Sequence, residues 1–194
     1  MIGMWILVGV LVVVGIYAIV TYNRFVSLTV RSEEAWADID VQLKRRYDLI
    51  PNLIETVKGY AAHERGVFEE VTKARAEATQ VHVDPENITP EQIQAMAGAE
   101  SALTDALGKL LAVAEAYPDL KASQNFSELQ TELVDTENKI QAARRFYNGN
   151  VRDLAIALQS FPSNVIGNLF SFTEREYFEL EENSVERENI NVAF

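Results

Sequence analysis

Three glutamates occupy the apolar stripes of the helical stretches, and they are the residues best suited to carry chemistry. Glu64, Glu100 and Glu137 each interrupt one stripe. Carboxylates that converge inside a helical bundle hold metal in di-iron proteins, which add a Glu-x-x-His motif on two helices. The chain has only His63 and His82, and neither follows a glutamate by three residues. A carboxylate-bridged metal enzyme is therefore a minor alternative, and we expect no metal ligands.

A buried polar layer is the more ordinary interpretation of these glutamates. Polar side chains on apolar stripes can hydrogen-bond across helices and fix their register, at some cost in stability. The other alternative is that these glutamates are exposed to solvent, which follows if the stripe is assigned one position away from its true place. The expected members of the layer are Glu100, Glu137, Asn138, Arg144 and Asn148.

No other pattern in the sequence indicates a reaction. The chain lacks cysteine, which excludes thiolate ligands and thiol nucleophiles. It contains no Gly-rich phosphate loop, nucleophile elbow or recognisable acid–base pair, so we expect no catalytic residue and no cofactor. A net charge of -12 argues against a nucleic-acid partner, because phosphate backbones bind clustered Lys and Arg.

A short basic cluster, Lys44 to Arg46, has two interpretations. It could bind anionic lipid head groups, although a straight helix would carry it about 35 Å from the membrane. A solvated face, or ion pairs with Asp40 and Asp48, fits this distance better.

The N-terminal stretch from Ile2 to Val20 predicts a membrane anchor. Its 19 residues carry no charge and would span about 28 Å as a helix, close to the hydrocarbon thickness of a bilayer. A signal peptide, the main alternative, would need a basic start and a small-x-small cleavage site, which are missing. The span is the only one of this length, so a single-pass protein is predicted. Arg24 and Arg31 follow it, and the positive-inside tendency then favours a cytoplasmic C-terminal domain.

The spacing of apolar residues beyond the anchor predicts an all-α fold. Steps of three and four residues indicate a first long helix from about Phe25 to Thr79, and the phase continues through Pro51. Proline costs roughly 3 kcal/mol inside a helix, so we expect a kinked but continuous helix there, with a helix boundary as the alternative. A second helix is expected from Pro90 to Ala116, with Thr89 and Gln92 forming a capping box.

The remaining stripe predicts a third long helix, opened by Asn125 and Glu128 and closed by Pro162. Ser163 could then cap a short final helix. The predicted architecture is an N-terminal transmembrane helix followed by an elongated antiparallel bundle, resembling a four-helix bundle, with three long helices and a short C-terminal one. The expected domains are an anchor (1–23), a helical bundle (24–172) and an acidic tail (173–194).

These lengths imply that part of the first helix stays uncovered. The second helix would end opposite Ile54, near Pro51, so a kink there would re-aim the membrane-proximal half. Trp36, Ile39 and Leu43 would keep an exposed apolar stripe, which proteins rarely leave to water. We expect these three residues to form a homo-oligomer interface. The segment after Pro162 is the alternative cover.

The C-terminal stretch "TEREYFELEENSVERENINVAF" contains seven glutamates and two arginines. Acidic segments of this kind are commonly mobile. Tyr177, Phe178 and Leu180 could instead pack on the stripe of the first helix. The apolar end at Val192, Ala193 and Phe194 could also be captured by a partner domain that binds carboxylates, as PDZ modules do.

Three stretches of the chain carry a family resemblance: "RFVSLTVRSEEAWADIDVQLKRRYDLIPNLIETVKGYAAHE", "AYPDLKASQNFSELQTELVDTENKIQAARRFYN" and "FPSNVIGNLFSF". They resemble the LemA family of bacterial membrane proteins. The resemblance implies one N-terminal anchor in the bacterial cytoplasmic membrane and an antiparallel helical bundle. It implies no reaction or cofactor, and some relatives are associated with the formation of internal membranes.

The sequence thus favours a membrane-anchored, non-enzymatic scaffold or adaptor that self-associates through its helical domain. Its expected partners are the lipid bilayer, further copies of the chain and an unidentified membrane-associated protein. A helical sensor or signalling module is the alternative, although only Met1 precedes the span as an output.

Overall fold

The computed structural model describes residues 1–85 and 87–179, and this part of the chain is helical without a strand. The all-α prediction is confirmed. The helices are α1 (Ile2–Lys58), α2 (Arg65–Gln80), α3 (Pro90–Glu115), α4 (Pro118–Lys121), α5 (Gln124–Gln159) and α6 (Ser163–Leu169).

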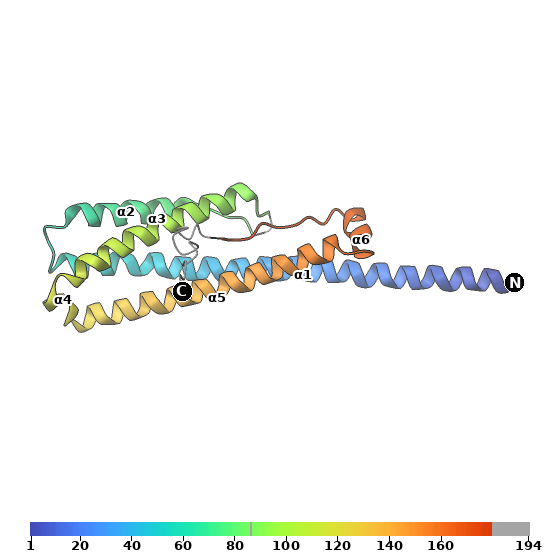
Figure 1. Ribbon diagram of the computed structural model, residues 1–194, viewed down its shortest axis with the longest axis horizontal. Helices are drawn as coiled ribbons and strands as arrows, with labels where there is room; N and C mark the ends of the chain where they lie inside the picture. The colour runs from blue at the N-terminus through green and yellow to red at the C-terminus, as the bar shows by residue number, and fades with distance from the viewer. Residues whose placement is uncertain (86, 180–194) are drawn as a thin grey trace, which may run out of the picture.

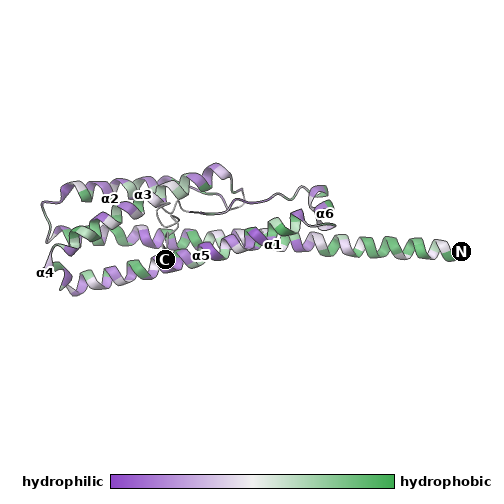
Figure 2. Cartoon of the chain, viewed as in Figure 1, coloured by the Kyte–Doolittle hydropathy of each residue, from purple (hydrophilic) through white to green (hydrophobic). Residues whose placement is uncertain are grey.

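Helix α1 is the axis of the molecule (Figure 1). Helix α5 runs antiparallel along it, while α2 and α3 form a pair that covers the half of α1 farther from the N-terminus. Helix α6 sits at the other end of the bundle, where α1 continues alone. Figure 2 shows that this lone part of α1 is almost uniformly apolar, whereas the helices of the bundle alternate between hydrophilic and apolar residues.

Helix α1 continues through Pro51, as the unbroken apolar phase predicted. The proline lies on the exposed side of the helix, between the buried residues Ile50 and Leu53. The helix nevertheless ends at Lys58, with Gly59 as its C-cap, so the prediction of one helix to Thr79 is wrong.

The chain reverses over residues 59–64 and returns as α2. Both limbs carry apolar residues at helical spacing, so periodicity alone does not reveal the reversal. The turn lets Phe68 and Val71 of α2 join Val57 and Ala61 in one core. A straight helix would have left the second limb projecting beyond the bundle.

The ends of the later helices follow the sequence signals only in part. The capping box of α3 is confirmed, because Thr89 Oγ1 accepts from the Gln92 amide at 3.3 Å and Gln92 Oε1 accepts from the Thr89 amide at 3.2 Å. Helix α5 begins earlier than predicted, after the N-cap residue Ser123. Ser163 is the first residue of α6 and caps nothing; its hydroxyl donates to the carbonyl of Ala157 at 2.7 Å.

The apolar stripe of α1 is covered within the single chain. Trp36, Ile39 and Leu43 are 1%, 0% and 1% exposed, so the prediction that they remain open for a second subunit is wrong. Helix α5 extends far enough along α1 to bring Tyr147 to a ring-centroid distance of 5.3 Å from Trp36. Phe178 lies at 5.2 Å from the same ring. The cover is therefore α5 and the segment after Pro162, the alternative that the sequence left open.

A second, smaller apolar cluster lies toward the N-terminal end of the bundle. Phe25 and Leu28 of α1 pack there with Leu154 and Ala157 of α5. Because α1 passes from the apolar stretch into this cluster as one helix, the predicted boundary after residue 23 falls inside a continuous element.

Candidate functional site

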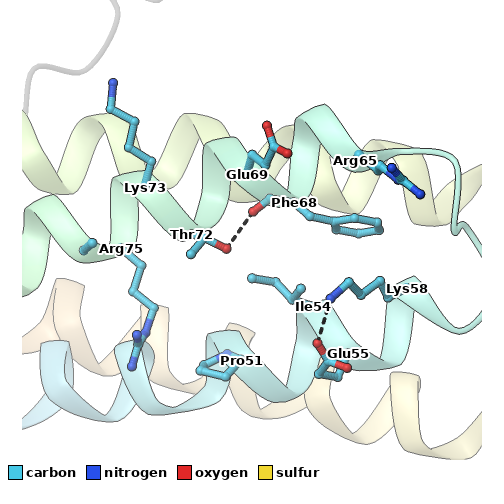
Figure 3. A pocket seen from close by; sticks show the side chains of 11 residues that line it. Pro51, Ile54, Glu55, Lys58, Arg65, Phe68, Glu69, Thr72, Lys73 and Arg75 are labelled. Carbon is cyan, nitrogen blue, oxygen red and sulfur yellow. Dashed lines mark hydrogen bonds and ion pairs between the residues drawn. The ribbon is translucent and has the colours of Figure 1, made fainter.

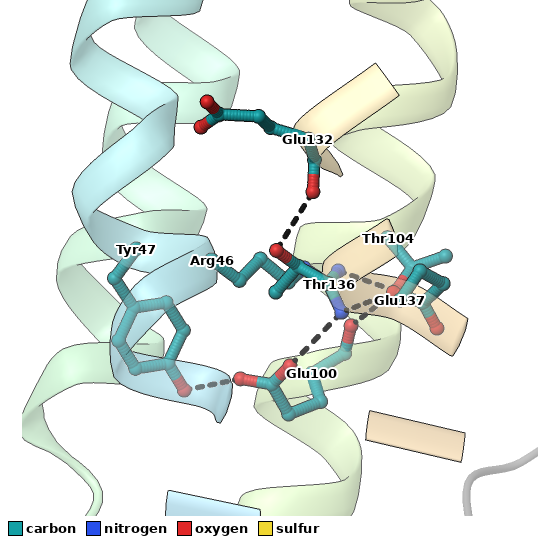
Figure 4. A network of polar contacts seen from close by, with 7 residues as sticks. All are labelled: Arg46, Tyr47, Glu100, Thr104, Glu132, Thr136 and Glu137. Atoms are coloured by element: carbon teal, nitrogen blue, oxygen red, sulfur yellow. Dashed lines mark hydrogen bonds and ion pairs between the residues drawn. The ribbon is translucent and has the colours of Figure 1, made fainter. Parts of the chain in front are cut away.

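A buried polar network joins three helices at the middle of the bundle, and Arg46 of α1 is its centre (Figure 4). Arg46 Nη1 donates to Glu100 Oε2 at 3.2 Å and to Glu137 Oε2 at 3.1 Å. Its Nη2 donates to Thr104 Oγ1 at 2.7 Å. The Tyr47 hydroxyl donates to the other Glu100 oxygen. One cation thereby links α1 to carboxylates on α3 and α5.

The helix periodicity explains how these groups meet. Arg46 and Tyr47 are consecutive residues of α1, and both are buried. Glu100 and Thr104 are four residues apart on α3, so they share a face, and Thr104 Oγ1 also donates to the Glu100 carbonyl at 2.9 Å. Arg46 and Glu100 are both 1% exposed. Two charges removed from water in this way must compensate each other closely.

The electrostatics of the site follow from its burial. Burial raises the pKa of Glu100, while Arg46 and the Tyr47 hydrogen bond act in the opposite direction. The pKa of Tyr47 is also raised, first by burial and then by the negative charge of Glu100. Tyr47 is therefore a proton donor that stays protonated at physiological pH.

This arrangement supports a structural role rather than a reactive one. The guanidinium occupies the place between the carboxylates that a metal ion would need, and all of its partners are side chains of the bundle. Within residues 1–85 and 87–179, no three metal-binding side chains come together. Glu64, the third candidate from the sequence, lies at the α1–α2 turn as the N-cap of α2. The network can fix the register of α1, α3 and α5.

The structure corrects the predicted membership of this layer. Glu100 and Glu137 do come together, but Asn138 is exposed on α5. Arg46, which was expected on a solvated face or in ion pairs with Asp40 and Asp48, is a member of the layer that the prediction lacked. The sequence held a signal for it, since Arg46 follows Leu43 by three residues and precedes Ile50 by four, which is a stripe position.

Arg144 and Asn148, the other two predicted members, contact the chain after α6. Asn148 Nδ2 donates to the Phe178 carbonyl at 3.1 Å, and Arg144 donates to the same oxygen at 3.4 Å. The Phe178 amide donates back to Asn148 Oδ1 at 2.9 Å. The hydrogen bonds that Arg144 and Asn148 make to Phe178 thus go to backbone atoms of the later chain, while the charge of Arg144 also opposes the rise that burial causes in the pKa of Glu100.

Residues 173–179 form a strap along the bundle, held by further contacts. Arg175 Nη2 lies 2.6 Å from Glu33 Oε1 of α1, and its Nη1 donates to the Pro85 carbonyl at 3.1 Å. The Tyr147 hydroxyl donates to the Glu176 carbonyl at 2.9 Å. Of the residues expected to pack here, Phe178 is buried, Tyr177 is exposed, and Leu180 lies outside the described residues, as do Val192, Ala193 and Phe194.

An open groove of about 750 Å³ lies between the end of α1 and α2 (Figure 3). Pro51 and Ile54 form one wall and Phe68 and Thr72 the other. Side chains of both signs line the groove: Glu55, Lys58, Arg65, Glu69, Lys73 and Arg75. Pro51 is thus a groove residue at the end of the bundle farthest from the apolar stretch.

Among the described residues, one helix is long and apolar enough to cross a membrane, and it is α1. None of the 18 consecutive residues that form the most apolar part of α1 is buried. The same helix becomes a core element of the bundle from Thr21 onward.

The chain matches the LemA family over residues 35–194. Magnetosome protein MamQ 2 of Paramagnetospirillum magneticum is 26% identical over 175 residues, and MamQ of Magnetospirillum gryphiswaldense is 25% identical over 174. Both alignments cover 81% of this chain and 64% of the relative. Protein LemA of Metamycoplasma hominis is 24% identical over 150 residues, covering 77% of this chain and 64% of that protein.

The chain thus spans slightly less than two thirds of the length of the curated relatives it matches. The names of these relatives attach no reaction to them, and the apolar α1 agrees with a membrane-associated protein. Since the family match covers most of the sequence and nearly the whole bundle, this all-helical chain belongs to the LemA family.

Proposed function

We propose that the protein is a membrane-anchored, non-enzymatic scaffold that self-associates through its helical domain and organises the membrane that holds it. The observation that carries this proposal is the continuity of α1, which runs from the apolar stretch into the core of the bundle without a break. A continuous helix transmits position and direction, which a flexible linker would lose.

The length of α1 supports a role as a rigid spacer. From Tyr22 to Lys58 the helix rises about 54 Å, at about 1.5 Å per residue. Helix α5 packs along this part, and the Arg46 network ties α1 to α3 and α5. Every anchored copy would therefore hold the groove between α1 and α2 at the same height above the bilayer.

The groove suits a second copy of the chain. Equal height brings the grooves of neighbouring copies to one level, and confinement to a membrane raises the effective concentration of copies. A two-fold contact pairs a surface with itself, so charges on that surface compensate each other only if both signs are present. Glu55 and Glu69 with Lys58 and Lys73 supply them around the apolar Ile54 and Phe68.

Location and topology belong to the same proposal. The bundle would lie on the cytoplasmic side of a bacterial inner membrane, because Arg24 and Arg31 follow the span. Since the chain has no cysteine, one introduced cysteine reports the side by its reaction with a membrane-impermeant reagent. Labelling in intact cells would contradict the cytoplasmic placement.

Cysteine crosslinking in membranes tests the self-association. Thr72→Cys puts a thiol in the groove, and Val134→Cys puts one on the exposed side of α5, near the level where Asp135 contacts Arg45. With a bismaleimide reagent, we expect crosslinked dimers from Thr72→Cys and few from Val134→Cys. Equal dimer yields from the two variants would show that contacts are random.

A second variant ties the crosslink to the groove. Ala76→Glu adds a charge to the exposed groove lining, and we expect it to reduce the Thr72→Cys dimer. A helical far-ultraviolet spectrum and an unchanged melting temperature would exclude unfolding as the cause. A monomeric full chain in nanodiscs at every loading would remove self-association from the proposal.

A further inference from the structure

The segment of residues 160–172, called here the α6 segment, packs beside α1 just after the apolar stretch ends. The Phe170 ring lies 4.8 Å from the Tyr22 ring, measured between centroids, and the Phe172 ring lies 5.5 Å from it. Phe172 also stacks on Phe25 at 5.0 Å. In Figure 1, α6 accordingly marks the end of the bundle from which α1 emerges alone.

This position corresponds to the head-group layer of a bilayer that surrounds Ile2 to Val20. Tyr22 lies about 3 Å beyond Val20 along the helix axis, and Phe25 about 7.5 Å beyond it, at about 1.5 Å per residue. Each head-group layer of a typical bilayer is about 5–8 Å thick. The α6 segment therefore lies at the level of the lipid surface.

The outer face of the α6 segment is apolar and open. Phe161 is 83% exposed and Leu169 is 71% exposed, while Val165 and Phe170 are 56% and 51% exposed. Val165 and Leu169 are four residues apart in α6, so they lie on one face. Phe170 is partly covered by its contact with Tyr22, but within residues 1–85 and 87–179 more than half of each of these four side chains stays exposed. Apolar groups gathered in this way usually mark an interaction surface.

The charge pattern separates this surface from the rest of the bundle. Residues 160–172 contain no Asp, Glu, Lys or Arg, although charged residues make up 24% of the chain. The chain as a whole carries a charge of -12, which repels anionic lipids. Any attraction of the α6 segment itself to a bilayer must therefore come from apolar burial, and it should depend little on salt or lipid charge.

The packing of the inner face holds the outer face in a fixed direction. A Cβ on Gly167 would lie 2.8 Å from Leu158 Cδ2 and 3.3 Å from Phe25 Cζ, so the inner face of α6 packs closely on both side chains. Ser163 Oγ donates to the carbonyls of Ala157 and Ser160 at 2.7 and 2.9 Å, which closes the α5–α6 turn. The apolar side chains of the outer face consequently cannot turn inward.

We propose that the α6 segment is a second membrane contact, whose outer face inserts into the lipid interface beside the transmembrane helix. Interfacial helices bury their apolar faces about 5–10 Å into the boundary between head groups and acyl chains. Insertion on one side of α1 sets the direction in which the helix tilts, so the bundle has one orientation on the membrane.

Fluorescence quenching in reconstituted full-length protein tests this contact. Leu169→Cys and Val165→Cys are labelled with an environment-sensitive dye in phosphatidylcholine vesicles that contain lipids with a nitroxide on the upper acyl chain. Phe146→Cys is the matched control, because Phe146 is apolar, 58% exposed, and about 20 Å farther from the span along α5. Each labelled variant is checked for an unchanged melting temperature.

We expect blue-shifted emission and strong quenching at positions 165 and 169, with neither effect at position 146. Replacing half of the phosphatidylcholine by phosphatidylglycerol, or adding salt, should leave the signal unchanged. A dye at position 169 that is quenched no more than the dye at position 146 would overturn the proposal.

Nanodiscs that hold one copy per disc show whether lipid or a second copy of the protein covers the outer face of the α6 segment. Quenching that persists with a single copy supports insertion into lipid. A blue shift that appears only with two copies per disc, without quenching, would overturn insertion and assign the surface to a second copy. The test is independent of the groove between α1 and α2, because Thr72→Cys crosslinking can succeed or fail without changing it.

Discussion

Asn148 binds the backbone of Phe178 through both ends of its amide: its Nδ2 donates to the Phe178 carbonyl at 3.1 Å, and its Oδ1 accepts from the Phe178 amide at 2.9 Å. The pair of bonds holds the Phe178 ring against Trp36, with the Arg144 guanidinium 5.1 Å above its centroid. A residue on α5 thereby fixes a segment 30 residues later as the cover of the α1 stripe.

Replacing Asn148 by Ala should release the strap of residues 173–179. Two lost hydrogen bonds at about 0.5–1.5 kcal/mol each predict a loss of about 1–3 kcal/mol in the free energy of unfolding. The measurements are the melting temperature of the full chain in nanodiscs and the rate of tryptic cleavage after Arg175. In the parent chain, Arg175 is held by Glu33 and the Pro85 carbonyl. Cleavage should accelerate in the variant, because release of the strap exposes this arginine to the protease.

Asn150→Ala is the matched control for this change. Its amide also donates one hydrogen bond, to the Phe146 carbonyl of its own helix at 3.1 Å, at the exposed surface. We expect a stability change within about 0.5 kcal/mol and no faster cleavage after Arg175. If both variants accelerated cleavage equally, the strap would not depend on Asn148.

Arg46→Met should be among the most damaging single changes outside the apolar core. It leaves Glu100 buried without its cation, and removing one partner of a buried ion pair costs about 3–5 kcal/mol. The pKa of Glu100 should rise further, so the loss should be larger at about pH 8 than at about pH 5. Thermal unfolding of the variant and the parent at both pH values measures this.

The neighbouring residue supplies the control. Arg45 pairs with Asp135 at 3.9 Å on the surface, with both side chains nearly half exposed. Arg45→Met should change the stability by less than about 1 kcal/mol at either pH. A comparable loss in both variants would mean that net charge, rather than the buried network, determines the effect.

The pH dependence of stability should carry the signature of Glu100. Burial raises its pKa in the folded chain above the unfolded value of about 4.3, so the folded state binds more protons in the window between the two values. The contribution of this group is therefore greatest below about pH 4.3 and decreases as the pH rises through the folded pKa. Relative to Glu100→Gln, which does not titrate, the parent should lose stability as the pH rises.

Asp135 provides a group with the opposite sign. The Lys139 ammonium, 2.8 Å away, hydrogen-bonds to its carboxylate and lowers its pKa. Its contribution is present above its unfolded pKa and is lost as the pH falls. The difference between the parent and Asp135→Asn should thus fall toward acid pH, contrary to the difference for Glu100→Gln. Two stability differences that change in the same direction with pH would contradict the assignment of Glu100.

Gly167→Ala tests how closely α6 packs on α1 and α5. The added methyl group would meet Leu158 Cδ2 at 2.8 Å and Phe25 Cζ at 3.3 Å, so the end of the Leu158 side chain has to move and the buried Phe25 ring has to give way, at about 1 kcal/mol. Gly98→Ala, at an exposed position of α3 with open space around it, should stabilise the chain by about 0.5–1 kcal/mol. The two melting temperatures should move in opposite directions, and a stabilised Gly167→Ala would contradict the tight packing of α6.

The sequence was sufficient for the local features whose causes lie within a few residues. The uncharged run from Ile2 to Val20 predicts that α1 is suited to a bilayer, since a spanning helix has to be long and apolar. Thr89 and Gln92 predict the start of α3, because a capping box is made by residues three apart. The apolar phase likewise predicts that α1 continues through Pro51.

Tertiary structure decided which faces meet. The stripes before and after residues 59–64 have the same period, so only packing reveals that the chain reverses there and that α2 pairs with α3. Arg46 reads as one of three surface cations until α3 and α5 bring Glu100 and Glu137 to it. The stripe at Trp36 requires a cover, and the length of α5 and the path of the strap decide that this cover comes from the same chain.

The physical reason is the range of the interactions. Hydrogen-bonded turns, helix caps and apolar runs long enough to cross a bilayer depend on residues that are neighbours in sequence, so the sequence alone determines them. Burial depends on elements far apart in sequence, such as Arg46 and Glu137 or Trp36 and Phe178, and it is fixed only when the whole set of helices packs together.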